Sequence, residues 1–132
     1  MNVKVQFSQM QWGRVLLIGV LVVILVIILN LVLPVLANHV WSQPDQAQIA
    51  IQFSSWSTYI LLLLLTFGSA LWVARTVVIE PLLHGVLIGL FVGIVICILT
   101  MCFGSPVMMA LVTLVLIMAA GCLGGLLGSW GR

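Results

Sequence analysis

Four long runs of apolar residues, at about residues 15–37, 56–75, 81–103 and 107–129, dominate this sequence. A helix needs about 20 apolar residues to cross the hydrocarbon core of a bilayer, and each run is long enough to do so. The runs are continuous rather than alternating, and in lipid a segment must satisfy its own backbone hydrogen bonds, which favours helices over strands. The sequence therefore predicts an all-α integral membrane protein, a four-transmembrane-helix bundle that forms one domain over residues 1–132.

The composition agrees with a membrane location. Hydrophobic residues make up 64% of the chain and charged residues 5%, whereas soluble domains average about 45–50% and about 25%. So few charges cannot cover a soluble protein of this size, and most of the surface is expected to face the lipid bilayer. The net charge is only +2 and no basic run is present, so no nucleic-acid partner is expected.

The basic residues predict an orientation. Lys4 and Arg14 precede the first run, Arg75 ends the second and Arg132 follows the last, so all four lie on one side of the predicted topology. Because Lys and Arg accumulate in cytoplasmic loops, both termini are expected in the cytoplasm, with the protein in the inner (plasma) membrane of the cell. The first run is longer than the 7–15-residue core of a secretion signal, so it is expected to remain as an anchor.

Prolines and the one long connection set the predicted helix ends. Pro34 is expected to kink or end the first helix, whereas Pro81 and Pro106 each open a helix, where a missing N–H is harmless. The connection 38–55 leaves two interpretations open. Its part from Gln46 to Phe53 spaces apolar residues among glutamines, which fits either a short amphipathic helix on the outer surface or a simple loop.

Glycines recur every four residues in the last two runs. Such small-residue faces let helix backbones approach closely, which drives helix association in lipid. In the predicted topology the glycines share the inner half of the membrane. They can serve as tight packing within one chain or as a homodimer seam, as a narrow cavity or pore open to the cytoplasm, or as a docking groove for another subunit. The candidate helix-packing residues are Gly68, Gly85, Gly89, Gly93, Gly121, Gly125 and Gly128, with Gly124 one turn before Gly128.

Four polar residues form a candidate polar site. Arg75, Glu80 and His84 cluster around the predicted turn between the second and third runs. They fit either a proton or anion site or an interfacial ion pair that stabilises the hairpin. Asn30 is the one strongly polar residue of the first run, and Thr113 lies at a similar estimated depth. An interhelical hydrogen bond is expected there, with ion coordination as the alternative.

No arrangement of residues indicates catalysis or a cofactor. Cys97, Cys102 and Cys122 form no Cys-x-x-Cys pair, and His39 and His84 fall on opposite sides of the predicted membrane, so they cannot ligate one haem. The two acids, Asp45 and Glu80, are also on opposite sides. The protein is therefore expected to have no enzymatic activity, no catalytic residue, no metal site and no cofactor.

Several short motifs support a resemblance. The stretch Gly68-Ser69-Ala70-Leu71-Trp72-Val73-Ala74-Arg75, then His84-Gly85 and Gly89, the glycine-rich end from Gly121 to Gly128, and Trp12-Gly13-Arg14 are similar to motifs of the YrzE-type small four-helix membrane proteins, a family of unknown function. Arg75 and His84-Gly85 match that pattern, whereas Ser69 and Ala74 stand where the family has glycine. The resemblance implies the architecture and no activity.

Two functions are consistent with these features. The small-residue faces and the absence of a recognisable site favour a non-enzymatic structural or accessory subunit, which binds other membrane proteins or associates with itself. The alternative is a small oligomeric channel or transporter. Four-helix exporters of this size need an acid in the first helix, where this chain has only Asn30.

Overall fold

The computed structural model describes residues 11–77 and 80–130. Within these ranges the chain is helical, without strands, and the predicted all-α class with four long helices is confirmed. Each long helix is sufficiently extended and apolar to cross a membrane. The predicted orientation was based on four basic residues, and two of them, Lys4 and Arg132, lie outside the described residues. The elements are α2 (Trp12–Val40), η1 (Pro44–Gln46, a 3₁₀ turn), α3 (Ala47–Thr76), α4 (Pro81–Cys102) and α5 (Val107–Trp130).

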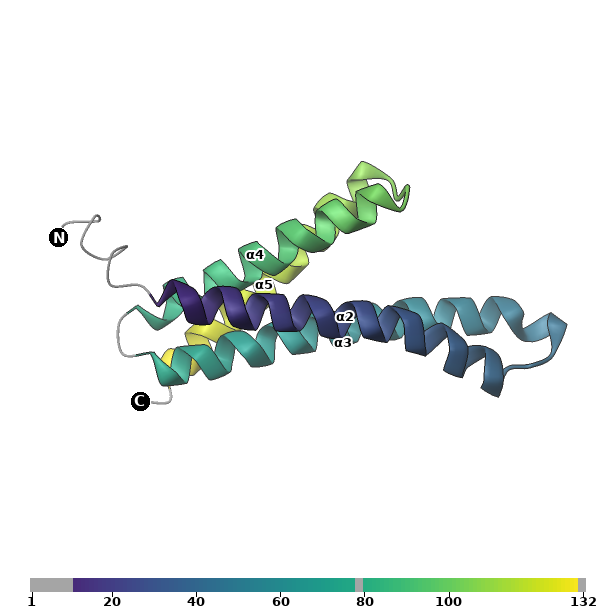
Figure 1. Ribbon diagram of the computed structural model, residues 1–132, viewed down its shortest axis with the longest axis horizontal. Coiled ribbons are helices and arrows are strands. Elements are labelled where there is room, and N and C mark those ends of the chain that lie inside the picture. Colours follow the sequence, from purple (N-terminus) through teal and green to yellow (C-terminus); the bar gives the residue numbers. More distant parts are fainter. Residues whose placement is uncertain (1–10, 78–79, 131–132) are drawn as a thin grey trace.

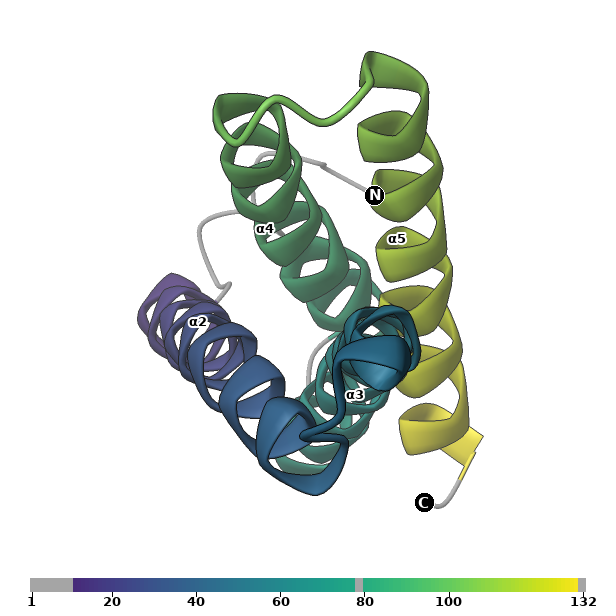
Figure 2. The ribbon, with the colours of Figure 1, turned by 90° about the vertical axis from the view of Figure 1, so that its right-hand side faces the viewer.

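The helices form two antiparallel hairpins, α2–α3 and α4–α5, which pack together at one end and diverge at the other (Figure 1). We call the packed end, where α2 and α4 begin, the proximal end, and the opposite end the distal end. The end-on view in Figure 2 shows α3 in the middle of the arrangement, and α3 contacts each of the other three helices. Within the described residues α2 and α5 do not contact each other.

Two helices extend farther than the sequence predicts. α2 continues through Pro34 to Val40, so Pro34 does not end the helix. A proline removes only the hydrogen bond to the carbonyl four residues earlier, and the following turns keep their hydrogen bonds, as the Trp41 amide donates to the Ala37 carbonyl at 2.9 Å.

α3 begins at Ala47, so both interpretations of Gln46–Phe53 are wrong. Residues 47–53 are neither a loop nor a separate surface helix, because no helix breaker separates them from the apolar run.

The turn between α4 and α5 has a specific local cause. Gly104 adopts a positive φ of 79°, and its amide donates to the Met101 carbonyl at 3.0 Å while the Ser105 amide donates to the Thr100 carbonyl at 3.1 Å. This pair of bonds is the Schellman motif, which satisfies the last carbonyls of a helix and favours glycine at the left-handed position. Pro106 then prevents the chain from continuing as the same helix.

The hydrophobic core lies where the two hairpins meet. It combines residues of all four helices with Val77, which directly follows α3, and every member except Leu62 is β-branched. β-Branched side chains have few rotamers to lose when they are buried in a helix interface. The core residues are Val15, Ile18, Val22, Val26, Leu62, Val73, Val77, Ile88, Val92, Ile96 and Ile117.

Candidate functional site

Glycines bring the backbones of α4 and α5 into close contact. A Cβ built on Gly85 would lie 2.7 Å from the carbonyl oxygen of Gly121 and 2.7 Å from the Cα of Gly125. In the opposite direction, a Cβ on Gly121 would lie 2.8 Å from the Cα of Gly89. Side chains cannot occupy such positions, so the two backbones are in direct contact and only glycine fits at this crossing.

A second face of α5 packs against α3. A Cβ on Gly124 would lie 2.5 Å from the carbonyl oxygen of Phe67. A Cβ on Gly128 would lie 2.5 Å from the Cβ of Ala74. Ala70 and Ala74 are fully buried. The pairs Gly121/Gly125 and Gly124/Gly128 therefore give α5 two adjacent small-residue faces, one for α4 and one for α3.

Gly68 does not belong to the packing surface that the sequence predicted for it. It is exposed, and no atom lies within 4 Å of the position that its Cβ would take. The reason is helical periodicity, because at about 100° per residue Gly68 and Ala70 lie about 200° apart around the helix. α3 turns Ala70 and Ala74 toward α5, so Gly68 faces outward.

Two other glycines are covered by side chains instead of backbone. At Gly93 a Cβ would lie 2.9 Å from Cδ1 of Leu114, and at Gly19 it would meet the ring of Phe91. Gly19 was not among the predicted packing residues, although it is the only glycine of the 15–37 run. Phe91 covers it from α4, so this contact attaches α2 to the second hairpin.

Arg75, Glu80 and His84 do not form the expected ion pair. Arg75 is exposed on the last turn of α3, and within the described ranges no salt bridge joins it to Glu80. Glu80 precedes α4 with a positive φ of 50°, a conformation that is uncommon outside glycine. The interaction between Glu80 and His84 uses the backbone carbonyl, which accepts from the His84 ring at Nδ1 over 3.0 Å.

His84 is the one polar side chain of this group that is buried, with 1% of its surface exposed. A carbonyl only accepts, so Nδ1 carries the hydrogen in this bond. Its other ring nitrogen, Nε2, is buried and has no hydrogen-bond partner within the described chain. His84 therefore places a buried acceptor without a hydrogen-bond partner in the described chain at the proximal end.

Asn30 makes no interhelical hydrogen bond. Its Nδ2 donates to the carbonyl of Val26 in its own helix at 3.1 Å. The Thr113 hydroxyl likewise donates to Met109 of its own helix at 2.8 Å. Because α2 and α5 do not contact each other within the described chain, the predicted pair cannot form. The membrane depth estimated from the sequence is similar for the two residues, but it does not show which helices are neighbours.

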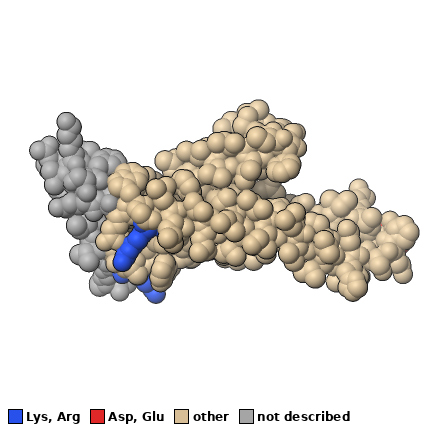
Figure 3. Space-filling model, viewed as in Figure 1, with Lys and Arg blue, Asp and Glu red and all other residues tan. Residues whose placement is uncertain are grey.

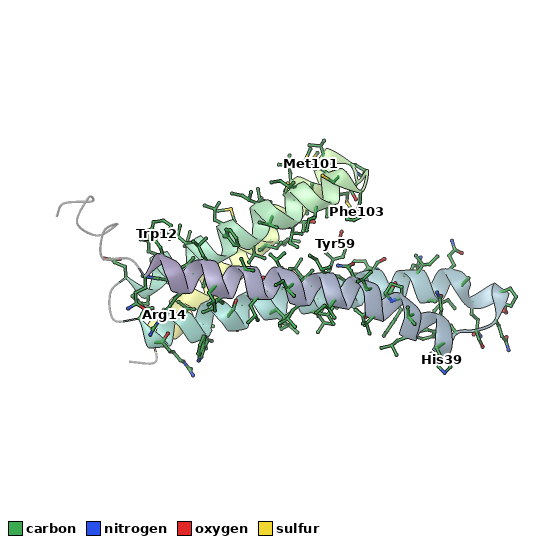
Figure 4. The ribbon with its side chains drawn as sticks, in the orientation of Figure 1. Trp12, Arg14, His39, Tyr59, Met101 and Phe103 are labelled. Atoms are coloured by element: carbon green, nitrogen blue, oxygen red, sulfur yellow. The ribbon has the colours of Figure 1, made fainter. Side chains whose placement is uncertain are left out.

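Asn30 instead lines a cleft that the sequence did not predict. Where the hairpins diverge, α3 is flanked by two grooves, one of about 550 Å³ toward α2 and α4 and one of about 460 Å³ toward α5. We call the two together the distal cleft, and its notch is visible in the space-filling view (Figure 3). Ser55, Tyr59 and Leu62 line both grooves. In Figure 4 the Tyr59 side chain rises from α3 toward the end of α4 that carries Phe103.

The described residues show no cluster of three or more His, Cys, Asp or Glu side chains that could bind a metal ion. Cys97, Cys102 and Cys122 are free thiols. No protein-family model, curated protein or solved structure is significantly similar to the chain. What the arrangement offers chemically is therefore a tightly packed proximal end and an open, partly polar distal cleft.

Proposed function

We propose that this chain is a multi-pass protein of the inner (plasma) membrane, with its proximal end in the cytoplasm, and that it serves as a non-enzymatic accessory or structural subunit. The four long apolar helices support the insertion. The orientation is supported by Arg14 in the first turn of α2 and Arg75 in the last turn of α3, both at the proximal end, where the blue surface lies in Figure 3. The positions of Lys4 and Arg132 in the sequence also support it. We also propose kinship with the YrzE-type membrane proteins on the motifs around Arg75 and His84.

The observation that carries the accessory role is the unequal length of the two hairpins. α2 and α3 have 29 and 30 residues, whereas α4 and α5 have 22 and 24. At 1.5 Å per residue α2 is about 10 Å longer than α4, and Figure 1 shows the first hairpin extending past the second. Its tip carries polar residues, including Asn38, His39, Gln43, Asp45 and Gln48.

The tip is also held together by its own side-chain packing. The rings of Trp41 and Phe53 pack with centroids 5.0 Å apart, and the small residues Ala37 and Ala50 are buried between the two helices. A helical tip with amide side chains presents hydrogen-bonding groups at little entropic cost, because its backbone is already fixed. We therefore propose that the tip contacts another subunit of a membrane complex, or a second copy of the chain, outside the membrane.

The orientation is tested by cysteine labelling. In a variant whose three native cysteines are replaced by serine or alanine, Gln43→Cys should react with a membrane-impermeant maleimide in intact cells. Thr76→Cys at the proximal end should react only after permeabilisation. The reverse pattern would contradict the orientation, and equal labelling of both sites, together with extraction of the protein by alkaline carbonate, would contradict insertion.

The association is tested by photo-crosslinking in the native membrane. A crosslinking amino acid at Gln43 or Gln48 should give discrete products that co-purify in mild detergent and are identified by mass spectrometry. The same amino acid at Val115, an exposed position of α5, is the matched control and should give only lipid products. A monodisperse monomer with no product from either tip position would overturn the proposal.

The alternative of a small channel or transporter has less support. Any path between α4 and α5 at the proximal end would have to pass the contact of Gly85 with Gly121 and Gly125, where the backbones touch. The distal cleft therefore ends at this packed half. Ion flux through liposomes that contain the purified protein would favour the channel and count against the accessory role.

A further inference from the structure

We propose that the distal cleft binds a membrane lipid with a small, uncharged, hydroxyl-bearing head, of the diacylglycerol class. The inference rests on the membrane insertion proposed above, and it adds a ligand to a protein for which none was expected. Four observations carry it: the layering of apolar and polar residues, the kind of hydrogen-bonding group that is left open, the absence of charge from the lining, and the shape of the two grooves.

Three helices give the larger groove the same two layers. Val26 of α2, Leu62 of α3 and Ile96 of α4 line its deep part and are all buried. One turn farther toward the distal end, each helix has a polar residue. These are Asn30, Thr58 and Thr100, and all three line the groove. The groove is thus apolar toward the middle of the molecule and polar at its distal mouth, as an amphipathic ligand requires.

Most of the open hydrogen-bonding groups of the polar layer are acceptors. The Thr58 hydroxyl donates to the Ser54 carbonyl at 2.9 Å, and the Thr100 hydroxyl donates to Ile96 at 2.9 Å. Asn30 uses its Nδ2 in the same way. Both threonine hydroxyls have therefore used their hydrogen on their own helix and can only accept from a ligand, whereas the Asn30 amide keeps its Oδ1 as an acceptor and its second N–H as a donor.

Asn30 adds acceptors of two kinds. Its side-chain Oδ1 receives no hydrogen bond from the described residues. Its backbone carbonyl cannot receive the usual helical bond either, because the residue four positions later is Pro34, which has no N–H. A hydroxyl group matches this layer, because it can donate to these acceptors and can also accept from the remaining N–H of Asn30 or from the Tyr59 hydroxyl.

The lining also limits the charge of the head. Within the described residues neither groove is lined by Lys, Arg, His, Asp or Glu. A phosphate group placed here would be a desolvated charge without a counter-charge, which is costly. An uncharged head avoids this cost, so a phospholipid is a poor ligand and a neutral alcohol lipid is a good one.

The two grooves match two chains. Tyr59 and Leu62 form a ridge of α3 that both grooves share, and each groove lies within the roughly 300–1,000 Å³ that is typical of ligand sites. One acyl chain can lie on each side of the ridge, with the head near the Tyr59 hydroxyl. That hydroxyl has no hydrogen-bond partner in the described chain, so it is free to bind the head.

The test uses a photoactivatable, clickable diacylglycerol with the purified full chain in phosphatidylcholine nanodiscs. We expect labelled peptides from the distal halves of all four helices at positions that line the grooves, and competition by unlabelled diacylglycerol but not by phosphatidic acid with the same chains. Equal competition by phosphatidic acid would overturn the uncharged head. Labelling spread evenly over exposed positions such as Val115 would show general lipid contact and overturn the site.

Variants that each remove one oxygen atom from the lining make the test specific to the cleft. Tyr59→Phe and Thr100→Val should each weaken labelling about three- to tenfold, the loss of one hydrogen bond. Ser69→Ala removes a hydroxyl that also bonds its own helix, at Thr66, but lies outside both grooves, and should not change labelling. Unchanged labelling in both groove variants would overturn the proposal. Asn30→Leu provides a third variant if either of them fails to fold.

Two further outcomes separate this inference from the proposed function. A crosslinking amino acid at Tyr59 that captures a protein instead of lipid would assign the cleft to a partner helix and overturn the lipid site. A protein that passes the Gln43→Cys and Thr76→Cys labelling test but does not bind the diacylglycerol probe would leave the membrane topology intact and reject only the ligand.

Discussion

Gly85 of α4 and Gly125 of α5 are in backbone contact, because a Cβ on Gly85 would lie only 2.7 Å from the Cα of Gly125. Nearby, Gly121 faces Gly89 in the same way. These contacts bring the second hairpin together at the proximal end and leave the distal end to diverge.

The first prediction concerns the crossing itself. Gly85→Ala should lower the free energy of unfolding by about 1–3 kcal/mol, because the added methyl meets backbone that cannot rotate away. Gly68→Ala is the matched control and should change it by less than about 0.5 kcal/mol, since nothing lies within 4 Å of its Cβ position. Thermal or SDS unfolding in detergent measures both. Equal effects in the two variants would show that the crossing is not as close as described.

The second prediction is a compensating pair between α3 and α5. Gly128→Ala places its methyl 2.5 Å from the Cβ of Ala74, so it should destabilise the bundle. Ala74→Gly removes that Cβ and should recover part of the loss, although the Leu71 carbonyl, 2.9 Å from the same position, limits the recovery. A double-mutant cycle in the same unfolding assay measures the coupling. Strictly additive effects would contradict the contact.

The third prediction compares a side-chain contact with a backbone contact. Gly19→Ala meets the ring of Phe91, which can shift, so it should cost less stability than Gly85→Ala. Combining Gly19→Ala with Phe91→Leu should reduce the cost further, because Leu is smaller than the ring. If Gly19→Ala proves as damaging as Gly85→Ala and Phe91→Leu brings no relief, then α2 is held in place by something other than this contact.

The fourth prediction tests the buried histidine. Because the Nε2 of His84 has no partner in the described chain, His84→Leu should leave stability unchanged or raise it, since it removes an unpaired buried polar atom. The Glu80 carbonyl remains bonded, as the backbone amide of residue 84 also donates to it at 3.3 Å. His84→Gln retains a buried polar group and should show no gain. A loss of more than about 1 kcal/mol on His84→Leu would reveal a partner for Nε2, such as an internal water.

The sequence alone was sufficient for the all-α class and the four long helices of the described chain, but not for the bounds of α2 and α3. Apolar length determined that there are four long helices, because a run of this length has no other stable form in lipid. Four-residue spacing determined that Gly121 shares a face with Gly125, and Ala70 with Ala74, because periodicity is a property of the single helix. Periodicity also separated Gly68 from Ala70, so its outward position could have been predicted from the helix alone.

Only the tertiary structure decided which face meets which neighbour. Asn30 and Thr113 lie at similar estimated depths, but their helices do not contact each other in the described chain. The crossing of α4 with α5, and of α5 with α3, depends on backbone contacts between segments far apart in the sequence, and these set the divergence of the hairpins. The distal cleft follows from that divergence. Its polar layer joins Asn30, Thr58 and Thr100 from three helices, and no local pattern relates these residues before the helices are packed.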